Sequence, residues 1–483
     1  MSLSKEQQYA FDKYKKGENI LLTGPGGTGK SKLIRNFINY SMSINSKVQV
    51  TALTGCAAIL LGVNAKTIHS WSGIRTAKGK PDQIIQQALR SKRIRRNWTS
   101  IKTLIIDEAS MMSVKVFDLL NKMAKSAKYN EKPFGGIQIV LVGDFYQLPP
   151  IETPNEPETG MFCFQSQDWS NVIPIQNHIE LTKIFRQRDS EYIKILNEIR
   201  IGEISEESKD TLKKYVKREY NKEDYNDAAL TKLFPLRNTV DMINTSMFNQ
   251  LEDEPTKYNL TKSTDNTTYL DSGTSIEREK LQACNNLSIS EIEVELQQLI
   301  SSTPCVEELL LKKGAAVMCN ANISMEHGIC NGTQGIILDL IGEEKLPRVK
   351  FANGVIMVIS KHHWQSEQYP SISICQYPLQ LAWALTIHKI QGTTLKMAQM
   401  DIGKDIFAYG QTYVALSRIE SLDGLYLSEF KPDRIRAHPK VKEFYSKIPP
   451  LEIPEDGPIM FKEFEYDPEM DKRDVKIIYM NIK

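Results

Sequence analysis

The segment GPGGTGKS at residues 24–31 limits what this 483-residue chain can fold into more than any other feature. It follows the apolar run at residues 20–23 and opens a stretch with helical spacing. In that context the pattern G-x-x-x-x-G-K-[ST] predicts a phosphate-binding loop, because glycines let backbone N–H groups surround phosphate oxygens at a helix amino terminus. Lys30 is then expected to reach the β- and γ-phosphates and Ser31 to bind Mg²⁺.

Short apolar runs alternate with helical patterns through the first 150 residues. The runs occupy residues 20–23, 47–53, 103–107 and 138–144. Such alternation predicts an α/β domain with a parallel sheet covered on both faces. Residues 75–103, which hold nine basic side chains and one acid, interrupt the pattern. They are expected to form a small protruding element.

The rest of the chain divides into blocks of different composition. A second strand and helix block starts near residue 181, after the Pro-containing loop TPNEPETG. Residues 251–303 are acidic and rich in Ser, Thr and Asn, and are expected to be loop-rich and partly mobile, with a helix only near residues 289–300. Residues 312–378 read as a small antiparallel barrel inserted in the second block. An acidic, Pro-containing tail ends the chain.

Composition bounds the class of protein to which the chain can belong. The size supports a large core, and seven Cys without a CxxC pair favour free thiols in a reducing, intracellular compartment. No apolar run is long enough to span a membrane. The net charge of +2, taken alone, argues against a nucleic-acid partner. Cys319, His327 and Cys330 lack the fourth ligand and the spacing of a zinc site.

Acidic and amide side chains follow the later strands of the first block. In IIDEAS, Asp107 is placed to hold a metal ion and Glu108 to take a proton from an attacking water. Gln147, in VGDFYQLPP, is placed to contact the γ-phosphate. Arg186 in LTKIFRQ and Arg418 in YVALSR are candidates to stabilise phosphate charge across an interdomain cleft. Each pattern has a structural alternative, such as a helix cap or a solvated arginine.

In this order the motifs resemble those of superfamily-one DNA helicases of the Pif type, a group that is also similar to RecD helicases. The resemblance covers roughly residues 3–445 and includes LSKEQQYAF, TALTGCAAILL, TIHSWSGI, KPFGGIQIVLVGDFYQLPP, LFPLRNTVDMIN and LQLAWALTIHKIQGTTL. It implies two RecA-like domains that bind ATP between them, with an SH3-like barrel inserted in the second. The implied boundaries are 1–180 for the first domain, 181–311 with 379–445 for the second, 312–378 for the barrel and 446–483 for the tail.

The same resemblance implies roles for individual residues. Gln7 matches the adenine-reading glutamine, and Gln391 with Gly392 matches the motif that links the nucleotide state to the grip on DNA. The nucleotide-binding set is Gln7, Gly24, Pro25, Gly26, Gly27, Thr28, Gly29, Lys30, Ser31 and Gly392; Mg²⁺ would bind Ser31 and Asp107. The catalytic positions are Lys30, Asp107, Glu108, Gln147, Arg186 and Arg418. The expected DNA contacts are Thr54, Ala57, Thr67, His69, Pro149, Thr386, His388 and Lys389.

The activity that follows from the resemblance is ATP-driven 5′ to 3′ movement on single-stranded DNA, with unwinding of forked duplex in replication, repair or recombination. The translocating species is expected to be a monomer. Two alternatives stay open: an ATP-binding nucleic-acid scaffold that does not unwind, and a RecD-like subunit of a nuclease complex. The string NKED at residues 221–224 matches a guanine-reading pattern, but it lies in a charged stretch rather than after an apolar strand.

Overall fold

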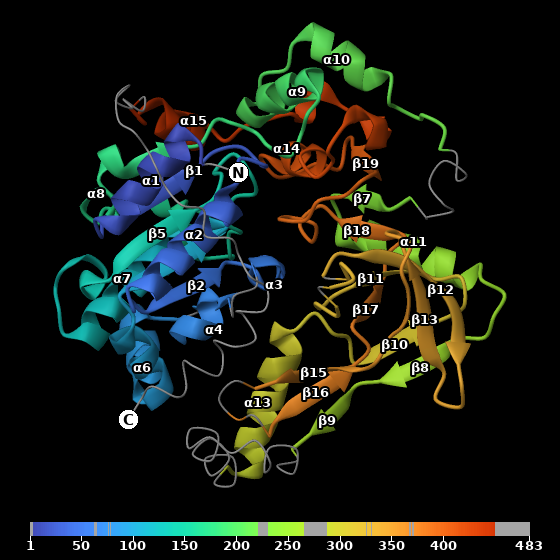
Figure 1. Ribbon diagram of the computed structural model, residues 1–483, viewed down its shortest axis with the longest axis horizontal. Coiled ribbons are helices and arrows are strands. Elements are labelled where there is room, and N and C mark those ends of the chain that lie inside the picture. Colours follow the sequence, from blue (N-terminus) through green and yellow to red (C-terminus); the bar gives the residue numbers. More distant parts are fainter. Residues whose placement is uncertain are drawn as a thin grey trace. The chain divides into compact units, whose positions relative to one another are not determined.

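The computed structural model (Figure 1) describes residues 3–61, 65–75, 77, 79–220, 230–264, 287–324, 326–329, 331–366, 369 and 371–449. The chain forms two compact units. The first comprises Met1–Tyr220, Leu230–Val240 and Ala384–Pro458, and the second includes Asp241–Trp383. The NKED string and residues 450–483 of the tail lie outside the described residues, as do residues 265–286 of the acidic segment 251–303.

The first sheet of the first unit has six parallel strands in the order β3-β2-β4-β5-β1-β6. The strands are β1 (Ile20–Thr23), β2 (Val48–Ala52), β3 (Lys66–Thr67), β4 (Thr103–Asp107), β5 (Gln138–Val142) and β6 (His178–Glu180). The four strands expected from the apolar runs are confirmed. The other two, β3 and β6, are too short and too polar for the pattern to reveal.

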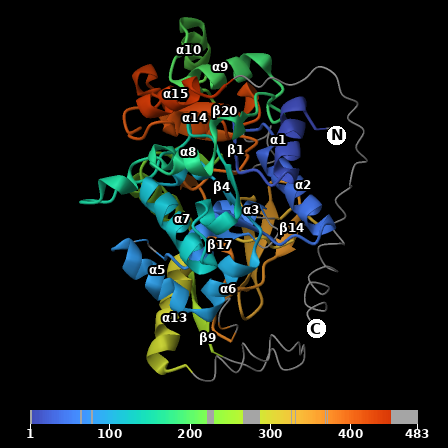
Figure 2. The same ribbon diagram turned by 90° about the vertical axis from the view of Figure 1, so that its left-hand side faces the viewer.

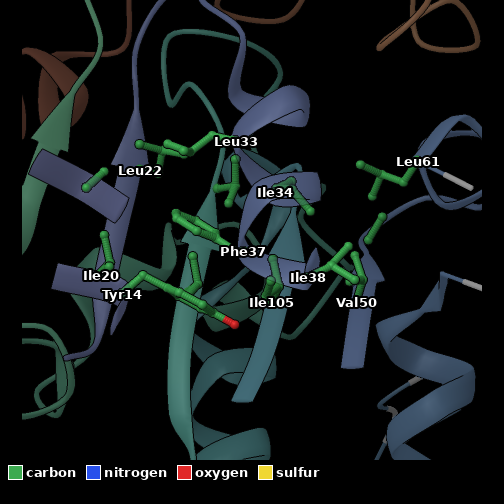
Figure 3. Close-up of a cluster of buried hydrophobic side chains, with 14 of the residues drawn as sticks. Tyr14, Ile20, Leu22, Leu33, Ile34, Phe37, Ile38, Val50, Leu61 and Ile105 are labelled. Atoms are coloured by element: carbon green, nitrogen blue, oxygen red, sulfur yellow. The ribbon is translucent and has the colours of Figure 1, made fainter. Parts of the chain in front are cut away.

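The helices that accompany this sheet are α1 (Lys5–Lys15), α2 (Lys30–Ser43), α3 (Gly55–Leu61), α4 (Ile68–Ser72), α5 (Pro81–Arg90), α6 (Lys92–Ser100), α7 (Val114–Lys128) and α8 (Trp169–Val172). The apolar side chains of α2 lie one turn apart, and Leu33, Ile34 and Phe37 are fully buried. Figure 3 shows them packed against Ile20 and Leu22 of β1 and Ile105 of β4. This core fixes the position at which the glycine-rich loop leaves β1.

The basic stretch forms two short helices, α5 and α6. Ile94 and Trp98 of α6 are buried, and the Trp98 ring lies 4.7 Å from that of Trp71. Lys92, Arg95 and Arg96 are exposed on the same helix. The apolar side of α6 therefore anchors an element whose other side is basic.

A second parallel sheet in the first unit has the order β18-β7-β19-β20. Its strands are β7 (Lys232–Phe234), β18 (Ala384–Thr386), β19 (Ala398–Ile402) and β20 (Leu425–Phe430). The nearby helices are α9 (Ser190–Ile201), α10 (Glu206–Lys213), α14 (Gln411–Leu416) and α15 (Pro439–Ser446), and α11 (Arg237–Asn249) leads from β7 into the second unit. Helices α9 and α14 lie side by side (Figures 1 and 2).

The second unit is mainly antiparallel. Five strands pair in the order β14-β13-β12-β11-β17: β11 (Ala316–Cys319), β12 (Gln334–Ile341), β13 (Leu346–Phe351), β14 (Ile356–Val358) and β17 (Leu379–Leu381). Two smaller sheets pair β8 (Thr256–Asn259) with β10 (Glu308–Leu311), and β15 (His362–Gln365) with β16 (Ser373–Gln376) and β9 (Thr261–Ser263). Helix α13 (Ile289–Ser302) is confirmed. The loop-rich expectation missed β8 and β9, which are held by pairing with distant strands.

Candidate active site

The glycine-rich loop joins β1 to α2, which begins at Lys30. Gly24 has a φ of +132°, and a Cβ at this position would lie 2.2 Å from the carbonyl oxygen of Leu181, so only glycine fits. The Lys30 ammonium donates to the carbonyl oxygens of Gly24 (2.7 Å) and Pro25 (2.9 Å). Burial lowers the pKa of Lys30, although the neighbouring carboxylates act to raise it. The structure thus places the Lys30 ammonium against the backbone of the glycine-rich loop.

The two acids stand where β4 ends. Asp107 accepts a hydrogen bond from the N–H of Glu108 (2.8 Å), and Glu108 has a left-handed backbone with a φ of +57°. Burial, with the adjacent Glu108 charge, raises the pKa of Asp107 to about 7. A divalent cation would relieve this, since a positive charge favours the ionised carboxylate. The donor set of Asp107 and the Ser31 hydroxyl therefore fits Mg²⁺, which keeps several waters when bound by few protein ligands.

A pair of amides connects Glu108 with the loop after β5. The Nε2 of Gln391 donates to the Oε2 of Glu108 (2.8 Å) and to the Oε1 of Gln147 (3.4 Å). Gln391 is 4% exposed and Gln147 is 7% exposed. Gln391 comes five residues after β18 of the second sheet, whereas Glu108 and Gln147 follow strands of the first. The predicted catalytic acid is thus in direct contact with a residue from the second sheet.

Both candidate arginines reach the glycine-rich loop. A Cβ at Gly26 would lie 3.8 Å from an Nη atom of Arg186 and 3.8 Å from one of Arg418. Arg186 donates to the carbonyl oxygen of Ser417 (3.1 Å), and Arg418 donates to that of Val414 (2.9 Å). Burial and the nearby Arg186 charge lower the pKa of Arg418 to about 10. Two crowded cations beside a phosphate loop form a site suited to a polyanion.

These groups surround one cavity of ≈ 360 Å³. It is lined by Gly26, Gly27, Thr28, Gly29, Lys30, Ser31, Asp107, Glu108, Gly143, Asp144, Gln147, Phe185, Arg186, Gly392 and Arg418. Gln7 lies at its margin, where its Nε2 donates to the carbonyl oxygen of Thr28 (3.0 Å). Phe185, which is 44% exposed, and Asp144 were missed from the sequence. Phe185 is the neighbour of Arg186, but no spacing rule singles out a phenylalanine there.

The candidate DNA contacts follow the carboxyl ends of their strands. Thr54 and Ala57 come after β2, Thr67 and His69 at and after β3, Pro149 after β5, and Thr386, His388 and Lys389 at and after β18. All but Ala57 are at least partly exposed. The three threonine hydroxyls accept local backbone N–H bonds, from Ala57, Ser70 and Lys389 respectively. The His388 ring stacks on Phe407 at 5.9 Å, and burial lowers the pKa of both histidines.

No zinc site accompanies this arrangement in the part of the chain that the structure describes, where no group of three or more His, Cys, Asp or Glu side chains could hold a metal ion. Cys319 is buried, and the Nδ1 of His327 pairs with the Ser324 hydroxyl (2.9 Å). Cys330 lies outside the described residues. Among the described helices none has the length and apolar character needed to cross a membrane.

Known proteins resemble the chain along most of its length. Residues 2–210 match the PIF1-like helicase family and residues 296–340 match the 2B domain of DNA helicase Pif1. The human protein named ATP-dependent DNA helicase PIF1 is 34% identical over 474 residues, 96% of this chain and 68% of the human protein. The chain spans 61% to 68% of the length of the curated PIF1 relatives from six species.

Solved structures agree. The crystal structure of Pif1 helicase from Candida albicans matches with a TM-score of 0.75 and 33% identity, over 93% of this chain and 100% of that one. A Bacteroides Pif1 structure in complex with ADP-AlF3 and ssDNA matches with a TM-score of 0.64 and 26% identity, over 92% and 97% of the two chains. The two parallel sheets are those of RecA-like domains. The chain belongs to the PIF1-like helicase family.

Proposed function

We propose that this protein is an ATP-dependent DNA helicase that moves 5′ to 3′ on single-stranded DNA and unwinds forked duplex. The observation that carries the proposal is the contact of Gln391 with both Glu108 and Gln147. It joins the acid that would activate water to a segment that also holds His388 and Lys389, two candidate DNA contacts. A protein that only binds ATP has no use for such a link.

The residues around the cavity have complementary tasks. Lys30 and the loop amides would hold the phosphates, and Ser31 with Asp107 would hold Mg²⁺, whose charge assists departure of the phosphate. Glu108 would accept the proton of the attacking water, and Gln147 would orient groups at the γ-phosphate. Arg186 and Arg418 would balance the negative charge that develops as the bond breaks.

The DNA contacts would follow from strand topology. Because parallel strands place their carboxyl ends at one edge of a sheet, Thr54, Thr67 and Pro149 are available at the edge that also carries the nucleotide loop. Hydroxyl and ammonium groups can hold phosphates without reading sequence, and the stacked pair His388 and Phe407 can contact bases.

We infer that two domains, residues 1–180 and residues 181–311 with 379–445, move relative to each other as ATP turns over. Residues 312–378 would form the inserted barrel.

Unwinding of matched duplexes that carry a 5′ or a 3′ single-stranded tail tests the proposal directly, with ATP and Mg²⁺ present. Only the 5′-tailed duplex should open, and single-stranded DNA should stimulate ATP hydrolysis. Opening of the 3′-tailed duplex alone would show that the protein moves 3′ to 5′ instead. ATP hydrolysis without opening of either duplex would instead favour the non-unwinding alternatives.

Lys30→Ala provides the site control. It removes the ammonium that the loop positions, and should abolish hydrolysis and unwinding while the chain still folds. A variant that turned over ATP at the wild-type rate would show that the site is elsewhere.

We infer that the translocating species is a monomer, and sedimentation during translocation on a DNA strand should show a monomer. An intracellular, reducing location remains our inference from seven cysteines without a CxxC pair.

A further inference from the structure

A buried network of hydrogen bonds surrounds Asp144, beside the nucleotide cavity. We call Asp144, Arg200, Tyr413 and Tyr445 the Asp144 cluster. Asp144 is fully buried, and its carboxylate accepts bonds from the Nε (3.1 Å) and Nη2 (3.0 Å) of Arg200. It also accepts from the hydroxyls of Tyr413 (3.1 Å) and Tyr445 (3.2 Å). A buried carboxylate that accepts this many hydrogen bonds fixes the positions of the groups around it.

Both tyrosines connect this carboxylate to the glycine-rich loop. The N–H of Gly26 donates to the Tyr413 hydroxyl (3.0 Å), and the Tyr445 hydroxyl is hydrogen-bonded to that of Thr23. Thr23 ends β1 directly before the loop, so Gly24 and Pro25 lie between two tethered residues. Because the Tyr413 oxygen accepts from Gly26, its proton is directed to Asp144. Burial raises the pKa of Tyr413, which keeps this proton in place.

Arg200 makes the cluster rigid. Its guanidinium lies 4.7 Å from the centroid of the Tyr146 ring and 5.1 Å from that of the Tyr445 ring, which stack on each other, and its Nη2 also donates to Glu180 (2.9 Å). Burial would lower the pKa of Arg200, but Asp144 and its neighbours hold it well above the ordinary value. Arg200 therefore keeps its charge, and its hydrogen bonds to Asp144 and Glu180 fix its place in the Asp144 cluster.

Helix α14 carries Tyr413 and leads to Arg418 two residues after its end. Gly410 is the residue before the helix and its N-cap, and a Cβ there would lie 2.2 Å from the carbonyl oxygen of Tyr146 and 2.6 Å from that of Gln147. This close approach, at a φ of +71°, requires glycine. The helix that delivers Arg418 to the cavity is thus seated on the loop after β5, and holds Gly26 through Tyr413.

We propose that Tyr413 is a positioning residue for nucleotide binding and hydrolysis. Through its hydroxyl it fixes the amide of Gly26, and with it the first half of the glycine-rich loop, while Asp144 fixes Tyr413 in turn. When α14 moves, Arg418 and the loop amide move together, so that the loop has its binding shape only when the arginine is in place. The hydrolytic part of this proposal rests on the proposed function; the effect on nucleotide affinity does not.

The test compares Tyr413→Phe with Tyr192→Phe. Tyr192 of α9 is a matched control. Its buried hydroxyl donates to the carbonyl oxygen of Leu416 in α14 (2.7 Å), the helix that carries Tyr413, but has no bond to the loop. Affinity is measured with Mg²⁺ and an ADP that carries a fluorescent anthraniloyl group. Loss of the hydrogen bond to the Gly26 amide should weaken binding by about three- to tenfold in Tyr413→Phe alone. The kcat of DNA-stimulated hydrolysis should fall in the same variant, with equal thermal midpoints for both.

A second measurement separates positioning from general damage. Asp144→Asn breaks the same chain of bonds, so the double variant with Tyr413→Phe should bind nucleotide as weakly as the weaker single variant. If the two substitutions weakened nucleotide binding by factors that multiply in the double variant, the proposal would be overturned. The same holds if the affinity of Tyr413→Phe lay within twofold of wild type or equalled that of Tyr192→Phe. A wild-type protein without DNA-stimulated hydrolysis would refute the proposed function, and the affinity comparison would still decide the role of Tyr413.

Discussion

Gln391 follows a strand of the second sheet and contacts two residues that follow strands of the first. Its amide donates to Glu108 and Gln147 at once, and its own Oε1 has no hydrogen-bond partner among the described residues. A buried acceptor without a partner costs free energy, so the position is suited to a group that changes partners during turnover.

Gln391→Ala should therefore lower the kcat of ATP hydrolysis by more than about tenfold, because Glu108 and Gln147 lose their shared donor. The KM for ATP should change much less, since Gln391 has no bond to the glycine-rich loop. Steady-state hydrolysis with saturating single-stranded DNA measures both constants. Gln8→Ala, which removes another buried glutamine whose amide bonds only to Asp12, should leave them unchanged. Equal losses in the two variants would argue for a purely structural effect.

Local spacing in the sequence singles out several of the residues that line the cavity. Gly24, Lys30 and Ser31 lie within eight positions, and Asp107 and Glu108 are adjacent at the end of an apolar strand. Arg200, Tyr413 and Tyr445 could not be found in this way. They are separated by up to 301 residues from Asp144, and nothing in a lone tyrosine distinguishes a buried hydroxyl from an exposed one.

Helix α15 packs on the first sheet through aromatic rings. Phe444 stacks on Phe164 at 4.3 Å and lies 5.4 Å from both Phe145 and His178. His178 is 6% exposed; its Nε2 lies 3.2 Å from the carbonyl oxygen of Ile173, and its Nδ1 has no partner among the described residues. The docking of α15 thus surrounds a histidine that is most stable without charge.

Stability should depend on pH through His178. Burial lowers its pKa to about 4, whereas the unfolded chain has the ordinary value of 6.5. Below pH 6.5 the unfolded state binds more protons, so the free energy of unfolding should fall as the pH falls towards 4, by at most roughly 3 kcal/mol. Urea unfolding of wild type and His178→Phe between pH 4.5 and 7.5 measures this difference. The exposed-residue control His327→Gln should follow wild type, and parallel curves for all three would contradict the assignment.

Long elements with a clear period were predictable, whereas short ones were not. Helix α13 and the four apolar strands of the first sheet appear where their patterns place them. Strands β3 and β9 have two and three residues, and their polar side chains carry no alternation; pairing with β2 and β16 makes them strands. The docking of α15 depends on contacts with residues about 280 positions earlier, which no local pattern records.

For the molecule as a whole, we expect the positions of the charged side chains to matter more for contact with DNA than the net charge does. The net charge is +2, yet α6 exposes Lys92, Arg95 and Arg96 on one side. If this side contacts the duplex of a fork, Arg95→Gln with Arg96→Gln should reduce the slope of log affinity against log salt concentration by about 1.8, since each neutralised phosphate contributes about 0.9.

Binding of forked DNA measured across a salt series gives this slope. Lys209→Gln with Lys213→Gln removes two cations of α10 that pair with Glu206 and Asp210, and should leave it unchanged. An unaltered slope in the α6 variant would show that this helix does not touch phosphate.

The fold class and the family followed from the sequence because motifs are local, whereas the domain boundaries and the barrel remain predictions.

The position of α15 has a consequence for how the chain acquires its structure during synthesis. Residues 439–446 cover Phe145, Phe164 and Trp169, which leave the ribosome some 270 residues or more before them. At ~5–20 residues per second, this aromatic surface stays open for roughly 15 to 60 seconds. The amino-terminal sheet therefore gains its contacts with α15 only after nearly all of the described chain has been made, and until then these aromatic rings lack that cover.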